Sequence, residues 1–321
     1  MTVTPSSPAR ANVCNVSWLG SPAVCREALR LRRDDITSAA GWRGGRTGRP
    51  RSSAHHRLAS RLRPVVAVPP RIQSPTPKPR LLIVSGPSCA GKSPLCAAAR
   101  KREPALFEDF SELVLYHSRS KRPEETEGED YFFRTREAIE ALRHEDDHVV
   151  WTVRDDLQAL DLGQLTERLA DGSVLYEGNF RIALDLRRRV DVPCLTVFVS
   201  PLTRDEVLAW KEDVGATVDE RVTEMMRRRL LRRAHSMKAT LSQPDLESIE
   251  ARASDAIEGL RCAHLFDHVI PNHDGEDSDH WELASEPIGD ARVAVEALCA
   301  LVADKTHPRV ERWAEDVMAG V

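Results

Sequence analysis

The chain has 321 residues, of which 41% are hydrophobic and 30% are charged, a composition typical of a globular protein that folds in water. Its net charge of −4 is unevenly divided, because residues 1–80 hold 15 of the 46 Lys and Arg residues but only 3 of the 50 Asp and Glu residues. The remaining residues therefore carry a net charge of −16, which disfavours a nucleic-acid-binding protein because an acidic body repels phosphate backbones. No apolar run approaches the roughly 20 residues that cross a bilayer, so we expect no membrane span.

Residues 1–79 form a basic N-terminal extension rich in Arg, Gly, Ser and Pro. Stretches such as 41–53 and 69–80 contain few apolar side chains to offset the entropy lost on folding, so we expect disorder there. Three interpretations remain open: a tail that touches nucleic acid or acidic surfaces, an Arg-rich targeting segment, or sequence with no selected role.

The chain has seven cysteines, which form neither a CxxC pair nor a cluster with His at metal-ligand spacing. Cys194 and Cys299 lie in apolar runs, where a cysteine behaves as a small hydrophobic residue. A reducing compartment fits this pattern best, and we expect a cytoplasmic protein. The sequence leaves the oligomeric state open.

From residue 80 onward, short apolar runs alternate with segments of helical periodicity. The runs that we expect to form strands are 81–85, 113–118, 149–153, 174–178, 194–200 and 268–270. The segments that we expect to form helices are 136–145, 162–171, 218–241, 246–263 and 290–304. This alternation predicts an α/β fold with a mostly parallel sheet flanked by helices.

The segment GPSCAGKSPL follows the first predicted strand and contains a complete phosphate-binding loop pattern, Gly-x-x-x-x-Gly-Lys-Ser. The glycines let successive backbone N–H groups point at an anion, and the helix that follows adds its positive N-terminal dipole. We expect Lys92 to reach the β- and γ-phosphates of ATP and the hydroxyl of Ser93 to bind Mg²⁺. The residues expected to bind the nucleotide here are Gly86, Pro87, Ser88, Cys89, Ala90, Gly91, Lys92, Ser93 and Pro94. Pro94 is compatible with the first turn of a helix, where its missing N–H loses no hydrogen bond.

A second charged segment, 118–133, places Arg119 and Arg122 three residues apart, followed by an acidic turn and an aromatic strand that begins near Tyr131. Two guanidinium groups at this spacing can hold a second phosphate, to which the Tyr131 hydroxyl could donate. A solvated charged loop is the alternative interpretation.

The two segments together resemble the guanylate kinase family. The second segment matches the family's spacing at Arg119, Arg122, Glu125, Gly128, Asp130, Tyr131 and Phe133. Segment 266–277 resembles the family's turn near adenine, with Asn272 at the nucleotide, and 249–260 resembles a helix that supplies a phosphate-contacting arginine, Arg252. The resemblance implies a P-loop NTPase-type parallel sheet with a small acceptor-binding insertion at about 113–160 and a helical lid at about 203–245. It gives a guanylate kinase-like domain at 80–305 and a C-terminal tail at 306–321.

Several positions depart from the family where the acceptor base is read. Leu115 replaces a serine, Val150 replaces the glutamate that reads guanine, and residues 158–160 replace a Tyr-Gly-Ser/Thr stretch. The nearby segment 154–162 offers new polar groups, of which Arg154, Asp155 and Gln158 are expected to contact the acceptor. Asp161 is either an acceptor contact or a helix N-cap.

Two further features have more than one interpretation. Glu177 ends a predicted strand, where a carboxylate could order Mg²⁺ waters or hold the acceptor, or form an ordinary salt bridge. In the basic segment 225–238, one helical stripe carries Arg228, Arg232 and His235, and Arg229 and Arg233 lie on an adjacent one. These arginines could stabilise the transition state or form a solvated face.

The resemblance implies an ATP- and Mg²⁺-dependent kinase whose catalytic residues are Lys92, Arg252 and Glu177. GMP is the leading acceptor, and the expected partner is a small phosphorylated molecule rather than a membrane or a nucleic acid. The alternatives are a kinase for a different small phosphorylated acceptor and a non-catalytic guanylate kinase-like binding module. The intact Lys92 and Ser93 oppose the binding module.

Overall fold

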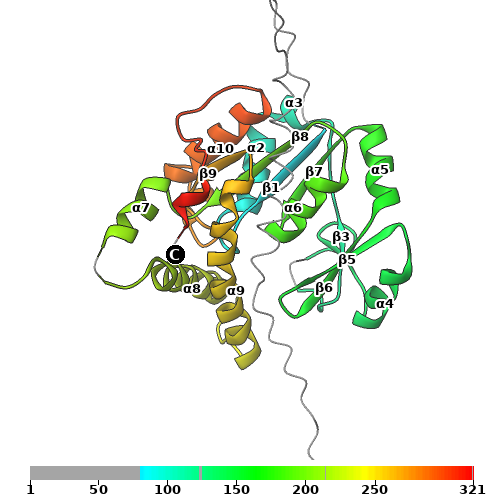
Figure 1. Ribbon diagram of the computed structural model, residues 1–321, viewed down its shortest axis with the longest axis horizontal. Coiled ribbons are helices and arrows are strands. Elements are labelled where there is room, and N and C mark those ends of the chain that lie inside the picture. The colour runs from blue at the N-terminus through cyan, green and yellow to red at the C-terminus, as the bar shows by residue number, and fades with distance from the viewer. Residues whose placement is uncertain (1–79, 123–124, 214, 320) are drawn as a thin grey trace, which may run out of the picture. The chain divides into compact units, whose positions relative to one another are not determined.

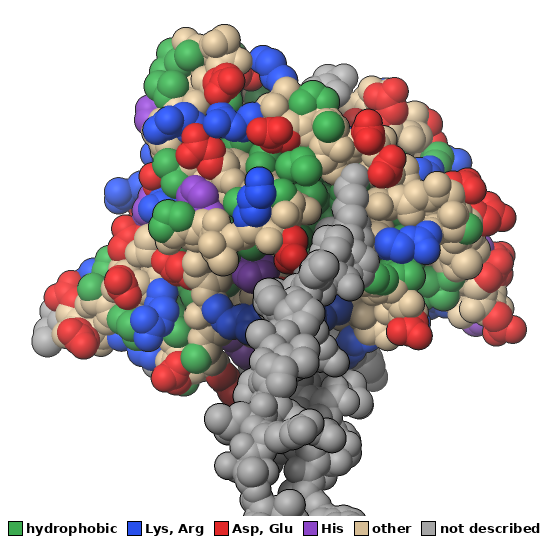
Figure 2. Space-filling view, turned by 90° about the horizontal axis from the view of Figure 1, so that it is seen from above, with side chains coloured by type: hydrophobic (Ala, Val, Ile, Leu, Met, Phe, Trp, Pro, Cys, Tyr) green, Lys and Arg blue, Asp and Glu red, His purple; other side chains and the backbone are tan. Residues whose placement is uncertain are grey.

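The computed structural model describes residues 80–321, apart from residues 123, 124, 214 and 320. The expectations for residues 1–79 lie outside the described residues. Within the described helices, no segment is long and apolar enough to cross a bilayer. Figure 2 shows Asp and Glu side chains spread over the face that it presents, as expected for a region of net negative charge.

The larger of two sheets has five strands, all parallel, in the order β2-β7-β1-β8-β9 (Figure 1). The strands are β1 (Leu81–Ser85), β2 (Phe110–Glu112), β7 (Ser173–Gly178), β8 (Cys194–Ser200) and β9 (His268–Pro271). All five residues of β1 are buried, which explains why this central strand is apolar until its final serine. Because the strands are parallel, their carboxyl ends meet at one edge, where ligands bind in such folds.

Helices cover both faces of this sheet. The core cluster packs Leu82 and Val84 of β1 and Val197 of β8 against α2 (Lys92–Arg102) and α10 (Gly289–Val302). On the other side, α6 (Phe180–Arg189) contacts β1, β7 and β8, and α5 (Leu162–Asp171) contacts β7. A short helix, α3 (Pro104–Phe107), links α2 to β2.

The smaller sheet has four strands in the order β4-β3-β6-β5. They are β3 (Leu115–His117), β4 (Tyr131–Phe133), β5 (His148–Val153) and β6 (Asp156–Asp161). The helix α4 (Arg136–Ala141) supplies Ile139 to a small apolar core that also contains Leu157 and Ala159. The chain turns from β5 to β6 through Arg154 and Asp155, and Arg154 has a φ of 57°. A positive φ in a two-residue hairpin turn matches the twist of the flanking strands.

The segment expected to form the lid, at about 203–245, contains α7 (Arg204–Glu212), α8 (Val218–Met237) and the start of α9 (Gln243–Arg261). A capping box of Thr217 and Glu220 begins α8, and one of Ser242 and Asp245 begins α9. The two long helices pack side by side. Residues 306–319 lie against the same domain, because Glu311 bridges to Val269 of β9 and Trp313 is buried.

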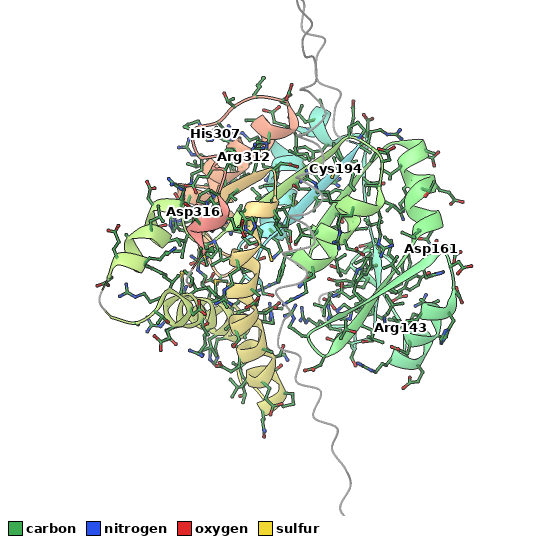
Figure 3. All side chains as sticks on the ribbon, viewed as in Figure 1. Arg143, Asp161, Cys194, His307, Arg312 and Asp316 are labelled. Atoms are coloured by element: carbon green, nitrogen blue, oxygen red, sulfur yellow. The ribbon has the colours of Figure 1, made fainter. Side chains whose placement is uncertain are left out.

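The expected α/β class with a parallel central sheet is confirmed. The described cysteines Cys89, Cys96 and Cys299 are free and buried. Asp161 caps α5 by accepting a hydrogen bond from the N–H of Gln164 at 3.1 Å (Figure 3 labels Asp161), which favours the N-cap interpretation. The sequence patterns did not reveal β6 as a separate strand, nor α6, because their apolar residues follow the preceding strand after only a short break.

Candidate active site

The loop between β1 and α2 wraps around its own lysine. Gly86 has a φ of 149°, and a Cβ built there would lie 2.3 Å from the carbonyl oxygen of Val199, so only glycine fits. Gly91 has a φ of 90° and is the N-cap of α2. The ammonium group of Lys92 donates a hydrogen bond to the carbonyl oxygen of Pro87 at 2.7 Å, which holds the lysine across the mouth of the loop.

The first turn of α2 contacts the end of β7. The hydroxyl of Ser93 donates to Oε1 of Glu177 at 2.9 Å. Burial raises the pKa of Glu177, although Lys92 and the Ser93 hydroxyl favour its ionised form. A hydroxyl and a carboxylate therefore meet beside the lysine at the carboxyl edge of the sheet.

The segment before β4 carries a bidentate ion pair. Both terminal nitrogens of Arg119 donate to the carboxylate of Glu125, with Nη1 at 2.6 Å from Oε2, and the backbone N–H of Arg122 donates to the same oxygen at 2.9 Å. The Arg119 guanidinium also lies 5.3 Å from the ring centroid of Tyr131. Glu125 thus fixes the two arginines relative to each other, a contact that the sequence spacing alone did not predict.

One cavity of about 480 Å³ joins these two groups of residues. The predicted site residues that line it are Gly86, Pro87, Ser88, Cys89, Lys92, Ser93, Arg119, Arg122, Tyr131, Arg154, Glu177 and Arg252. Those that do not are Ala90, Gly91, Pro94, Asp155, Gln158 and Asn272. The phosphate-binding loop and the arginine segment therefore face a shared space.

The positive charge of this cavity is concentrated around Arg252 of α9. Burial, and then the charges of three neighbouring arginines, lower the pKa of Arg252 to about 9. Those neighbours are Arg122, Arg154 and Arg233. Clustered guanidinium groups repel one another, so an anion that enters the cavity relieves the repulsion.

The structure also separates the lid arginines. Arg233 lines the cavity, whereas Arg228 pairs with Glu224 and Arg232 pairs with Asp277. Arg229 is buried, and its Nη1 atom has no hydrogen-bond partner in the described part of the chain. Arg233 is thus the lid arginine that faces the cavity, a choice that helical periodicity alone left open.

Gln158 is buried beside His117, which in turn packs against Tyr131. The Nδ1 atom of His117 accepts a hydrogen bond from the backbone N–H of Arg119 at 3.1 Å, and its Nε2 atom lies 3.4 Å from the amide of Gln158. The His117 ring packs edge-on against Tyr131, with 4.8 Å between ring centroids. Burial, followed by the charge of Arg119, lowers the pKa of His117 to about 3, so this histidine is neutral at pH 7. His117 thus contacts the backbone of Arg119 and the ring of Tyr131, and Gln158 lies beside His117.

The positions at which the sequence departs from the family pattern for the acceptor base are filled by packed apolar side chains. Leu115 is 2% exposed and Ala159 is fully buried. Val150 packs against the core cluster that contains Leu157 and Ala159, and none of these residues lines the cavity. The side chain of Trp151 instead donates to Asp185 of α6 at 2.9 Å and ties the small sheet to the large domain.

Three residues near the loop, Asn272, Cys89 and Glu276, have surroundings that the sequence did not predict. Asn272 is fully buried and donates to the carbonyl oxygen of Ala90 at 2.9 Å, so it braces the loop from outside the cavity. Burial, followed by the charges of Glu276 and Asp277, raises the pKa of Cys89 to about 12, which keeps its thiol protonated at neutral pH. Glu276 also lines the cavity, and the sequence signal for it was only its place in an acidic run after the Asn272 turn.

The parallel sheet, its phosphate-binding loop and the adjoining arginine cavity define a kinase of the P-loop class. A sequence profile of guanylate kinases matches residues 78–155. The chain is 30% identical over 198 residues to a guanylate kinase of Gloeobacter violaceus, a match that covers 61% of this chain and 81% of the relative. It is 34% identical over 138 residues to one of Nocardia farcinica, covering 42% and 69% of the two chains. The chain belongs to the guanylate kinase family.

Among solved structures, guanylate kinase from Anaplasma phagocytophilum aligns with a TM-score of 0.42 at 16% identity. This alignment covers 72% of the present chain and 89% of that chain.

Proposed function

We propose that this kinase transfers the γ-phosphoryl group of ATP to the phosphate of a nucleoside monophosphate, with GMP as the first acceptor to test (ATP + GMP = ADP + GDP). The observation that carries the proposal is that one and the same cavity is lined by Lys92 of the loop and by Arg119 and Arg122 of the arginine segment. The name shared by the relatives supports GMP as the acceptor. We assign the catalytic unit to residues 80–305, with the acceptor region at about 113–160 and the lid at about 203–245.

In this proposal the donor phosphates lie on the loop. The backbone N–H groups of residues 86–91 bind phosphate oxygens, and Lys92 neutralises charge on the β- and γ-phosphates. Arg233 of the lid and Arg252 of α9 line the cavity and stabilise the charge that develops on the transferred group.

The acceptor phosphate lies against Arg119, Arg122 and Tyr131, with Arg154 at the margin of the cavity. One of its oxygen atoms forms a bond to the γ-phosphorus, and the bond from that phosphorus to the β–γ bridging oxygen breaks. The electron pair stays on the bridging oxygen, which leaves as the terminal oxygen of ADP. No covalent enzyme intermediate is required, so the enzyme works by alignment and charge neutralisation.

The residues beside the loop fit Mg²⁺. Ser93 and Glu177 offer a hydroxyl and a carboxylate, the oxygen ligands that this ion prefers, and they lie within hydrogen-bond distance of each other. Ser93 would hold the ion and Glu177 would order its waters. When bound, Mg²⁺ neutralises charge on the donor phosphates.

A second candidate function is the phosphorylation of a different small phosphorylated acceptor. The apolar packing of Leu115, Val150 and Ala159 favours it, because these side chains cannot form the hydrogen bonds that distinguish guanine. Transfer requires only the phosphate of the acceptor at the arginines, so the chemistry is the same for both candidates.

An ADP-release assay with Mg-ATP and a panel of GMP, AMP, CMP, UMP and sugar phosphates separates the possibilities. Turnover with GMP alone supports the first proposal, and turnover with another acceptor supports the second. A Lys92→Ala variant should lower either activity by about 100-fold to 1000-fold. If the wild-type enzyme releases no ADP with any acceptor, the transferase proposal fails and a binding module is favoured.

A further inference from the structure

The segment between β9 and α10 lies directly on the phosphate-binding loop. A Cβ built on Gly275 would lie 2.3 Å from the carbonyl oxygen of Cys89, so the two backbones touch with no room for a side chain. The indole N–H of Trp281 donates to the carbonyl oxygen of Gly275 at 2.9 Å. Asn272 bonds both to Ala90 of the loop and to the carbonyl oxygen of Asp274 in this segment. We call residues 272–281 the strap.

The strap inserts a carboxylate where the loop binds anions. The backbone N–H of Gly91 donates to Oε2 of Glu276 at 2.9 Å, and Glu276 lines the same cavity as Lys92. Although burial acts in the opposite direction, the charges of Lys92 and Arg233 and the Gly91 N–H hold the pKa of Glu276 below its usual value. Glu276 is therefore an anion with three phosphate-type partners: a loop amide, the loop lysine and a lid arginine.

The next residue ties the strap to the lid. The carboxylate of Asp277 lies 2.6 Å from Nη2 of Arg232 on α8, and its side chain is only 5% exposed. The Cys89 thiol lies 3.7 Å from the other oxygen of this carboxylate. Successive carboxylates of one segment thus contact the loop and α8.

We propose that Glu276 is an internal ligand of the phosphate-binding loop, which the donor triphosphate must displace in order to bind. The proposal rests on the proposed function only in taking the donor to be a nucleoside triphosphate. A phosphate oxygen that accepts the Gly91 N–H requires the position that Oε2 of Glu276 occupies. Two anions beside one lysine also repel each other.

The expected consequence is a weaker apparent affinity for the donor. When only a fraction of molecules has an open site, the apparent dissociation constant rises by the inverse of that fraction. Glu276 therefore sets the concentration of donor that is needed to fill the site. The Asp277–Arg232 pair links release of the loop to movement of the lid.

Titration calorimetry on the full chain tests this proposal with two probes, Mg-ADP and inorganic tripolyphosphate. Glu276→Ala removes the carboxylate, and Glu276→Gln keeps its shape but removes its charge. Both variants should bind both probes more tightly than the wild type, by about tenfold or more, if the strap is docked in most molecules. Glu282→Gln is the matched control, because this exposed residue lies just after the strap and loses the same charge. It should bind like the wild type.

Unchanged or weaker binding of tripolyphosphate by both Glu276 variants, with melting temperatures like that of the wild type, overturns the proposal. The Gln variant covers the case in which the Ala variant fails to fold. Tripolyphosphate carries no base, so its result does not depend on the identity of the donor. Tighter tripolyphosphate binding without any ADP binding supports the internal ligand and counts against ATP as donor, whereas the turnover panel tests the proposed function separately.

Discussion

Compared with the guanylate kinase family, the loop at the carboxyl end of the large sheet retains its motif, whereas the interior of the small sheet differs at several positions. The loop keeps every residue of its phosphate-binding pattern, and its glycines occupy conformations that other residues rarely adopt. The small sheet keeps the arginines and the tyrosine that face the cavity, but Leu115, Val150 and Ala159 form packed interior behind them. The difference suggests that phosphate recognition and base recognition are separable: the first uses backbone geometry and charge, and the second uses a few replaceable side chains.

The largest effect should come from the loop. Lys92→Ala removes the ammonium group that lies at the cavity, so we expect kcat to fall by about 100-fold to 1000-fold, as for other charge-stabilising groups. Steady-state ADP release measures it. Lys101→Ala at the exposed end of α2 is the control, and an equal loss in that variant would argue against a specific role for Lys92.

A substitution in the core of the small sheet should lower the stability of the protein and affect binding of the acceptor. It should leave the affinity for the donor unchanged. Leu157 is 1% exposed, and Leu157→Ala should lower the free energy of unfolding by about 2–5 kcal/mol. Urea denaturation measures this loss, and calorimetry with Mg-ADP should give an unchanged affinity because the donor loop lies on the other sheet. If Leu157→Ala also lowered the affinity for ADP, the donor loop and the small sheet would not be independent of each other.

The arginine segment should have a smaller and more local effect. Arg122→Ala removes a guanidinium group from the cavity, and the KM for the acceptor should rise by about tenfold to a hundredfold, as expected for a charge-assisted hydrogen bond. The KM for ATP should change little. Arg134→Ala, in an exposed pair with Glu127, is the control. An equal rise in the KM for the acceptor in both variants would show that the loss of any positive charge weakens binding, and not the loss of Arg122 in particular.

The smallest expected effect is the contribution of His117 to the pH dependence of stability. Its pKa falls from 6.5 to about 3 on folding, so between these values the unfolded chain binds a proton that the folded chain does not. The contribution of His117 to stability is therefore complete above pH 6.5 and is lost as the pH falls toward 3. Urea denaturation across this range should show a shallower pH dependence in His117→Gln. An unchanged slope in that variant would contradict the buried neutral histidine.

Local patterns predicted the parts of the site that depend on neighbours in the chain. The loop residues and the spacing of Arg119, Arg122 and Tyr131 could be identified because each motif lies within about 16 consecutive residues. The role of Asp161 as an N-cap also follows from local chemistry.

The remaining features depend on distant contacts. Glu276 meets Gly91 across 185 residues of sequence, and no periodicity encodes that approach. The choice of Arg233 among the lid arginines depends on how α8 packs, since Arg229 and Arg233 lie on one stripe yet only Arg233 lines the cavity. Charge patterns likewise gave no indication that Glu125 would take both nitrogens of Arg119.

Phosphorus NMR of the reaction product offers the sharpest test of in-line transfer between two phosphate groups in one hollow. With Mg-ATP and the acceptor that supports turnover, the new resonances should belong to a diphosphate, because the transferred group becomes attached to phosphate oxygen. A product phosphorylated on a hydroxyl, or inorganic phosphate alone, would contradict the assignment of Arg119 and Arg122 to the receiving phosphate.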